Sequence, residues 1–135
     1  MSTPEIKLRN RVRAGDVGGV KGMLKAGEVD YTAPGETLRG FTPLHLACWG
    51  SLKPENDKDI VEALLITAQK AGAAQEQALR DAADFIDGLK PVDLAKERRD
   101  TLSQRNPQAK EEDLMEEKRR FDKVIEYLEK GLPAT

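Results

Sequence analysis

One short string of residues constrains the fold of this chain more than any other part of its 135 residues. Residues 40–47 read Gly-Phe-Thr-Pro-Leu-His-Leu-Ala, and a weaker copy, Gly-Leu-Lys-Pro-Val-Asp-Leu-Ala, occupies residues 88–95. Proline is favoured at the first position of a helix, where its missing N–H would have no partner. A threonine before it can cap the helix through its hydroxyl. We therefore predict helices that begin at Pro43 and Pro91, the first capped by Thr42.

Three further segments have the pattern of amphipathic helices that would pair with such first helices. Apolar residues recur three and four positions apart in residues 17–27, 59–65 and 123–131. Two of these segments end in glycine, the residue that most often terminates a helix. Residues 12–16 resemble the end of one more first helix and its turn. The sequence therefore predicts an all-α chain built from helix pairs.

The string Thr-Pro-Leu-His-x-Ala is the signature of ankyrin repeats, and the chain resembles ankyrin-repeat proteins over most of its length. The resemblance implies a single domain over residues 1–135. It also implies a solenoid of stacked helix pairs, whose stability comes from the contacts between neighbouring repeats. The implied repeats are residues 5–35, 36–75 and 84–132.

The resemblance assigns structural roles to the motif. The ring of His45 is expected to bridge Thr42 and the backbone of the neighbouring repeat. The motif positions are Gly40, Thr42, Pro43, Leu44, His45 and Ala47, with Gly88 and Pro91 in the weaker copy. The first half is also similar to small stand-alone ankyrin proteins of the myotrophin type, at residues 15–16, 20–21 and 25–27.

The spacing departs from the family. Ankyrin repeats are about 33 residues long, whereas the two copies of the motif are separated by about 15 residues more. We place the insertions at residues 53–58, 71–84 and 100–122. The second of these is rich in alanine, glutamine and charged residues and has helical propensity. Insertions in repeat proteins often lie on the binding face.

The last helix is predicted to be unusually long. Asn106 and Pro107 form a good helix start, and acidic residues precede basic ones as the helix dipole favours. A helix over residues 107–130 would be about 36 Å long at about 1.5 Å per residue. Its first half should project beyond the stack or fold back across it. It is either an elongated capping helix or a docking arm for a partner.

Composition narrows the functional classes. The net charge is only −2, so nothing favours nucleic acid as a partner. No apolar run is long enough for a transmembrane helix, and one cysteine cannot form an internal disulfide. We expect a cytoplasmic or nuclear protein that does not bind membranes, with Cys48 as a buried small hydrophobe. A single histidine leaves few ways to build a catalytic pair or metal site. No enzymatic activity, metal or cofactor is therefore expected.

A group of carboxylates raises the alternative of a metal-binding protein or an enzyme. The positions are Asp81, Asp84, Asp87 and Asp93, of which the first three are spaced as on one helix face. The pattern of a calcium-binding EF-hand loop is absent. A metal-binding protein or an enzyme that uses acidic residues is therefore an unfavoured alternative.

The candidate binding residues lie on the side that ankyrin proteins turn towards their partners. Trp49 falls at the end of the first helix, and Phe41 and Leu89 lie at matching positions before the two prolines. Aromatic residues dominate binding hot spots. These side chains are either exposed anchors or are buried beneath the insertions. The predicted partner-binding set is Arg39, Phe41, Trp49, Leu89 and Arg98.

We therefore predict a non-catalytic module that binds another protein through the concave ankyrin face. The main alternative is a subunit or assembly factor that docks through the long C-terminal helix. Homo-oligomerisation through Phe41 and Trp49 is a further option, which the sequence does not favour.

Overall fold

The computed structural model describes residues 3–35 and 40–133, and within them every regular element is a helix. The prediction of an all-α chain is therefore confirmed for the described residues. The elements are α1 (Pro4–Ala14), α2 (Val17–Ala26), α3 (Pro43–Trp49), the 3-10 turn η2 (Pro54–Asn56), α4 (Asp57–Ala71), α5 (Ala73–Asp81), α6 (Pro91–Asp100), α7 (Leu102–Arg105) and α8 (Glu111–Lys130).

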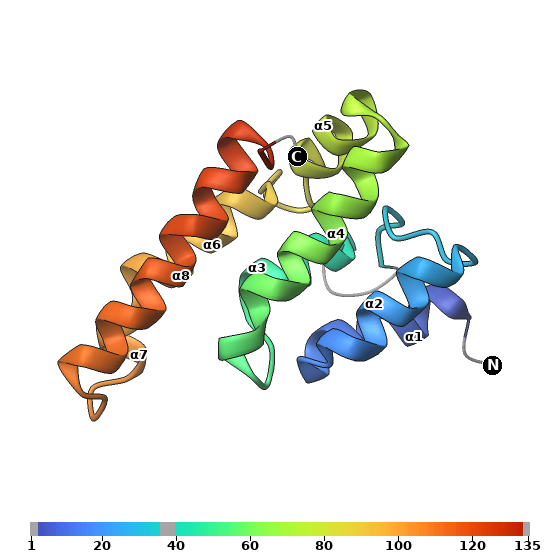
Figure 1. Ribbon diagram of the computed structural model, residues 1–135. Coiled ribbons are helices and arrows are strands. Elements are labelled where there is room, and N and C mark those ends of the chain that lie inside the picture. The colour runs from blue at the N-terminus through green and yellow to red at the C-terminus, as the bar shows by residue number, and fades with distance from the viewer. Residues whose placement is uncertain (1–2, 36–39, 134–135) are drawn as a thin grey trace.

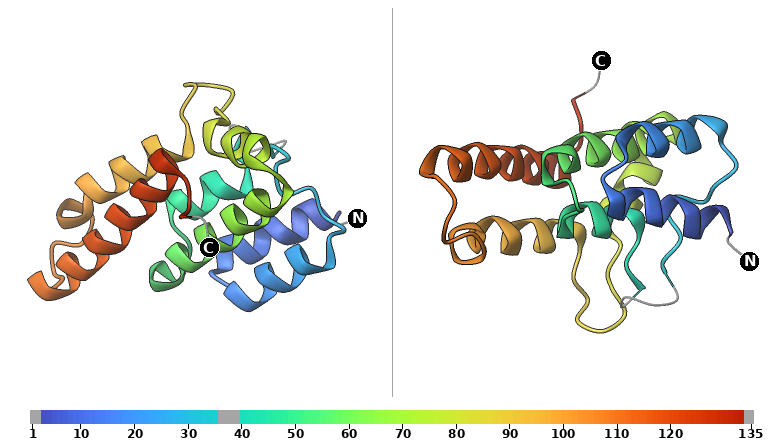
Figure 2. Two further views of the ribbon diagram at one scale, coloured as in Figure 1. Left: turned by 45° about the horizontal axis from the view of Figure 1, so that its top comes forward. Right: turned by 90° about the horizontal axis from the view of Figure 1, so that it is seen from below.

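The main helices are arranged as pairs in two layers. Helix α1 packs on α2, α3 on α4, and α6 on α8 (Figure 1). Along one layer α3 contacts both α1 and α6, and along the other α4 contacts both α2 and α8. Figure 2 shows the two layers edge-on, with the loop between α5 and α6 leaving on the side of α1, α3 and α6. Each helix therefore buries its apolar side against the other helix of its pair and against the neighbouring pair.

A single hydrophobic cluster lies between the two layers. The fully buried members come from all three pairs, so that no pair has a core of its own. Burying one such side chain stabilises a protein by about 1.5–3 kcal/mol. The large side chains with the lowest exposure include Leu8, Val12, Val20, Leu44, Ile60, Val61, Leu64, Leu65, Leu79 and Leu94. No helix in the described ranges is long and apolar enough to span a membrane.

The first helix of each pair begins at a proline, and each start is secured locally. The hydroxyls of Thr3 and Thr42 accept hydrogen bonds from the backbone N–H three residues on, at 3.2 and 3.3 Å. The third pair has Lys90 at this position, which has no hydroxyl. There the carboxylate of Asp93 accepts the backbone N–H of Lys90 at 2.9 Å. The N–H of Asp93, which a threonine hydroxyl would have accepted, donates instead to the carbonyl of Lys90 at 3.0 Å.

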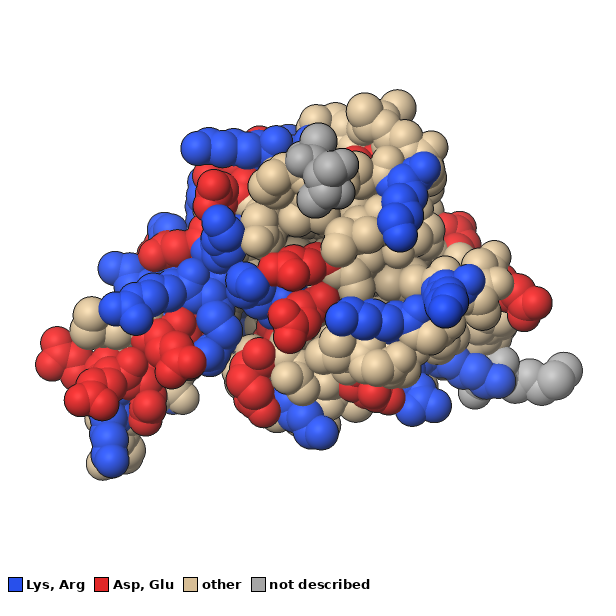
Figure 3. Space-filling model, in the orientation of Figure 1, with Lys and Arg blue, Asp and Glu red and all other residues tan. Residues whose placement is uncertain are grey.

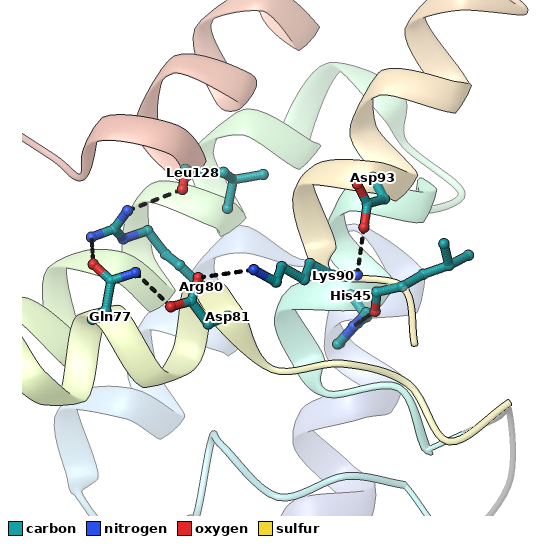
Figure 4. A network of polar contacts seen from close by, with 8 residues as sticks. His45, Gln77, Arg80, Asp81, Lys90, Asp93 and Leu128 are labelled. Carbon is teal, nitrogen blue, oxygen red and sulfur yellow. Dashed lines mark hydrogen bonds and ion pairs between the residues drawn. The ribbon is translucent and has the colours of Figure 1, made fainter. Parts of the chain in front are cut away.

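Helix α5, which lies in the second predicted insertion, ties the last pair to the rest. Its Arg80 donates to the carbonyl of Leu128 in the last turn of α8 at 3.1 Å, and to Gln77 at 2.8 Å (Figure 4). Asp81 accepts from Gln77 at 2.6 Å and lies 3.7 Å from the ammonium group of Lys90, at the start of α6. Arg80 lies at the C-terminal end of α8, which is the negative end of the helix dipole, where a cation is favourable. The insertion is therefore an ordered helix that contacts α4, α6 and α8.

The predicted start of the last helix is wrong. Helix α8 begins at Glu111 and not at Pro107. The amide of Asn106 donates to the carbonyl of Leu102 at 3.0 Å, and the N–H of Ala109 bonds to the carbonyl of Asn106. Asn106 therefore closes α7 and makes a turn, instead of opening α8.

The third insertion forms a helical hairpin. Helix α8 has 20 residues, which corresponds to about 30 Å. Its first half packs on α7, and the two project beyond the rest of the stack (Figure 1). We call this hairpin, residues 101–120, the α7–α8 extension.

Candidate protein-binding surface

The histidine of the signature motif links two helix pairs. The backbone N–H of Thr42 donates to Nδ1 of His45 at 3.2 Å, so Nδ1 is the acceptor nitrogen. The proton therefore resides on Nε2, which donates to the carbonyl of Leu89 at 2.9 Å. Burial lowers the pKa of His45, although the bond to Leu89 opposes this shift. Both ring nitrogens are engaged in the bridge that the resemblance implied, which leaves neither as a general base.

The predicted acidic cluster is divided among separate structural roles. One carboxylate oxygen of Asp84 accepts the backbone N–H groups of residues 86–89 at 2.8–3.4 Å, and this organises the loop before α6. Burial raises the pKa of Asp84, but these backbone bonds outweigh it and the pKa is lowered. Asp81 and Asp93 contact Lys90. Among the described residues, no three His, Cys, Asp or Glu side chains are grouped so as to hold a metal ion.

Cys48 is a packing residue. Its side chain is 1% exposed, and burial raises the pKa of the thiol far above its usual value. A reactive cysteine needs the opposite, an accessible thiol with a lowered pKa. The prediction of a buried small hydrophobe is therefore confirmed.

The candidate binding residues differ in exposure. Trp49, at the end of α3, is 40% exposed. Phe41 is buried, and its ring stacks on that of His45 with the centroids 5.2 Å apart. Leu89 is half-buried and packs against the core. Arg39 lies outside the described residues. Of the three apolar candidates, only Trp49 is therefore exposed.

Arg98 of α6 covers part of the Trp49 ring. Its Cζ atom lies 4.8 Å from the ring centroid, within the range of a cation–π interaction. Burial and the neighbouring charge of Arg105 lower the pKa of Arg98. The Nε atom of Arg98 is buried without a hydrogen-bond partner among the described residues. Two residues from different helix pairs thus form one composite surface.

A pocket of about 510 Å³ opens beside Trp49. Helix α1 contributes Asn10, Arg13 and Ala14, and helix α3 contributes Leu46 and Trp49. Phe41, from the segment before α3, also lines the pocket, and residues 50–52 close one end. The backbone N–H of Leu52 bonds to the carbonyl of Arg13 at 3.0 Å, which fixes this segment on α1. The side chain of Leu52 is left 84% exposed. We call this site the α1–α3 pocket.

The opposite layer carries a groove of nearly the same size. This α2–α4 groove has a volume of about 520 Å³ and is lined by Lys21, Lys25 and Lys70 around Ile66. In Figure 3, basic side chains lie around neutral surface over α2 and α4. Volume therefore does not distinguish the two sites, but their linings do. Tryptophan and arginine are enriched at binding hot spots, whereas lysine is depleted at interfaces, which favours the α1–α3 pocket.

The α7–α8 extension is highly charged, with five acidic and five basic residues. Its carboxylates gather at the free end of the hairpin (Figure 3), where α8 starts with Glu111, Glu112 and Asp113. Met115 is 48% exposed beside them, next to a shallow hollow of about 260 Å³. Large apolar side chains are also exposed in the loop before α6, at Phe85 and Ile86.

Comparison of the chain with known protein families, with characterised proteins and with solved structures gives no match in any of the three.

The predicted binding set includes two residues of the pocket lining, Phe41 and Trp49, and Arg98 beside them, but the pocket itself was not predicted. The pocket depends on Asn10, Ala14 and Leu52, none of which is unusual for its position in the sequence. The one available signal is Leu52, a large apolar residue in an otherwise polar segment between two helices. Exposed residues of that kind are informative only when they join a larger patch.

Proposed function

We propose that the chain is a small ankyrin-repeat protein that binds another protein through the α1–α3 pocket. The observation that carries the proposal is Trp49, the only tryptophan, exposed at the edge of a pocket with apolar walls. An amphipathic aromatic side chain in such a position supplies much contact area at low entropic cost. A partner side chain entering the pocket would displace water from Trp49, Leu46 and Leu52.

Three features support the ankyrin assignment within this proposal. The helices form pairs in two layers, the loop before α6 leaves on the side of the first helices, and His45 bonds to the backbone of the next pair. Each of these is expected of stacked ankyrin repeats. In such a solenoid the first helices and loops form the binding face, which is the side on which the α1–α3 pocket opens.

The proposal describes a binding protein and not an enzyme. The only histidine is engaged at both ring nitrogens, and the only cysteine is buried with a raised pKa. Neither can act as a nucleophile or general base without disrupting the core.

The experiment is affinity capture from a lysate of the source organism with the immobilised chain. Wild type is compared with Trp49→Glu and with Ile66→Glu. Ile66 is a matched control because it is 41% exposed and lies in the α2–α4 groove, on the other layer. We expect a partner that is retained by wild type and Ile66→Glu and lost with Trp49→Glu.

A circular dichroism melt of each variant verifies that it is folded. A partner retained equally by all three proteins would show that the α1–α3 pocket is not the contact. Loss with Ile66→Glu alone would move the contact to the α2–α4 groove.

The α7–α8 extension is the second candidate. Met115 is exposed at its acidic end, away from the stack. In the same capture experiment, Met115→Glu should leave binding unchanged under the main proposal. Loss of the partner with this variant alone would favour docking through the extension.

A further inference from the structure

The rim of the α1–α3 pocket carries basic groups. Arg13 is exposed on one side and lines the pocket. On the other side, Arg98 lies over Trp49, and its Nη2 atom is 3.5 Å from the position that a Cβ atom on Gly50 would occupy. Gly50 itself lines the pocket. None of the described lining residues is acidic.

Neither Arg13 nor Arg98 forms an ion pair with a described residue, although the carboxylates of Asp57, Glu117 and Glu97 all act on Arg98 through space. The carboxylate of Asp57 lies 3.7 Å from the same Gly50 position. Asp57 is buried, and both its oxygens accept the backbone N–H of Ser51 at 3.2 Å. On the other side, Arg105 donates to the carbonyl of Arg98 at 2.6 Å and adds a second positive charge.

The pocket therefore combines an apolar cavity, one exposed tryptophan and arginines on its rim. Arginine binds carboxylates through paired, charge-assisted hydrogen bonds. Such a bond is stronger when the arginine is partly shielded from water, as Arg98 is. Lysines of the α2–α4 groove also attract anions, but that groove offers no aromatic ring among its described lining residues.

We propose that the partner presents a segment in which a large apolar side chain is followed or preceded closely by a carboxylate. The apolar side chain fills the α1–α3 pocket against Trp49, and the carboxylate pairs with Arg13, while Arg98 adds positive charge beside Trp49. This inference rests on the proposed function, since it names the chemistry of the segment that the same pocket binds. Binding should weaken as salt is added, because the rim charges are exposed.

The test is selection from a random twelve-residue peptide library, displayed on phage, against the immobilised full chain. We expect selected peptides in which Asp or Glu lies within two positions of Leu, Ile, Met or Phe. A synthetic copy of one such peptide is then measured by fluorescence polarisation. Trp49→Ala and Arg13→Glu should each weaken its binding at least tenfold. Lys21→Glu, the same charge reversal in the α2–α4 groove, should change it less than twofold.

A charge exchange sharpens the test. Replacement of the peptide carboxylate by lysine should abolish binding to wild type and restore it to Arg13→Glu. This compensation requires direct proximity, which a loss of folding cannot imitate.

The other outcomes separate the two claims. Peptides that need Trp49 but show no acidic preference would overturn this inference and leave the proposed function standing. Acidic peptides that are sensitive to Lys21→Glu and not to Arg13→Glu would place the anion site in the α2–α4 groove and overturn it too. Absence of any peptide that depends on Trp49 would overturn the proposed function itself.

Discussion

At the scale of single residues, His45 is the most constrained side chain. It is fully buried, stacks on Phe41 and joins Thr42 to the carbonyl of Leu89. A buried polar group that loses its partner pays the full cost of desolvation. The histidine of the motif therefore stabilises the contact between the second and third helix pairs.

Replacement of this residue should be costly. His45→Ala leaves the N–H of Thr42 and the carbonyl of Leu89 without their partner and opens a cavity. We expect the free energy of unfolding to fall by about 2–4 kcal/mol, measured by urea denaturation. Lys7→Ala, at an exposed position of α1, serves as the control. A loss below about 0.5 kcal/mol would contradict the bridging role.

Asp57 predicts a dependence of stability on pH. Burial raises the pKa of this carboxyl from 3.8 to about 6, although bonds from Ser51 oppose the shift. The carboxyl group therefore binds a proton more readily in the folded state than in the unfolded state. Its ionisation lowers the free energy of unfolding of the chain as pH rises from about 4 through about 6. His45 acts with the opposite sign, since its lowered pKa costs stability as pH falls below 6.5.

Asp57→Asn isolates the first effect. The amide keeps an acceptor for Ser51 and removes the buried charge, so it should stabilise the chain at pH 8. A shift of two pKa units sets a ceiling of about 3 kcal/mol, and burial of the amide N–H group should reduce the gain to about 1 kcal/mol. At pH 4 the gain should vanish. Equal differences between variant and wild type at pH 4 and pH 8, by urea denaturation, would refute this assignment.

At the scale of elements, the sequence predicted helix starts where the signal is local. Pro43 and Pro91 begin α3 and α6 as expected, because proline and its neighbours act within one turn. The same Thr-Pro sequence at Thr3 begins α1, although no helix start was predicted there. The start of α8 was mistaken because Asn106 closes α7 instead. Which of two adjacent helices an asparagine caps depends on how the chain turns between them.

Helix α2 contains a glycine that lowers its stability and that the packing does not require. Gly22 lies in the helix interior, and a Cβ atom there would meet nothing within 4 Å. Gly22→Ala should therefore stabilise the chain by about 1 kcal/mol.

A matched substitution gives the opposite expectation. Gly15 has φ +73°, and its Cβ would lie 2.7 Å from that of Lys53, so Gly15→Ala should destabilise the chain by more than 1 kcal/mol. Thermal melts of both variants provide the measurement. A shift of the midpoint in the same direction by both variants would contradict the local geometry of α2 at Gly22 or of the turn between α1 and α2 at Gly15.

At the scale of the whole molecule, the sequence predicts the pairing of helices but only part of the proposed binding surface. Periodic apolar residues and the repeated motif indicate helix pairs, since each helix must bury one face. The α1–α3 pocket, in contrast, forms between two pairs and depends on how closely they stack. The position of Arg98 over Trp49 joins residues 49 positions apart. No local pattern encodes such a contact.

The most direct test of the central claim uses Trp49 as its own reporter, since it is the only tryptophan. A tryptophan-free peptide that binds the wild-type chain is titrated while emission and acrylamide quenching are recorded. If the α1–α3 pocket is the binding site, saturation should shift the emission to shorter wavelength and sharply reduce quenching, because water and quencher are excluded from the ring. Saturated binding with unchanged emission and quenching would place the partner elsewhere and contradict the account.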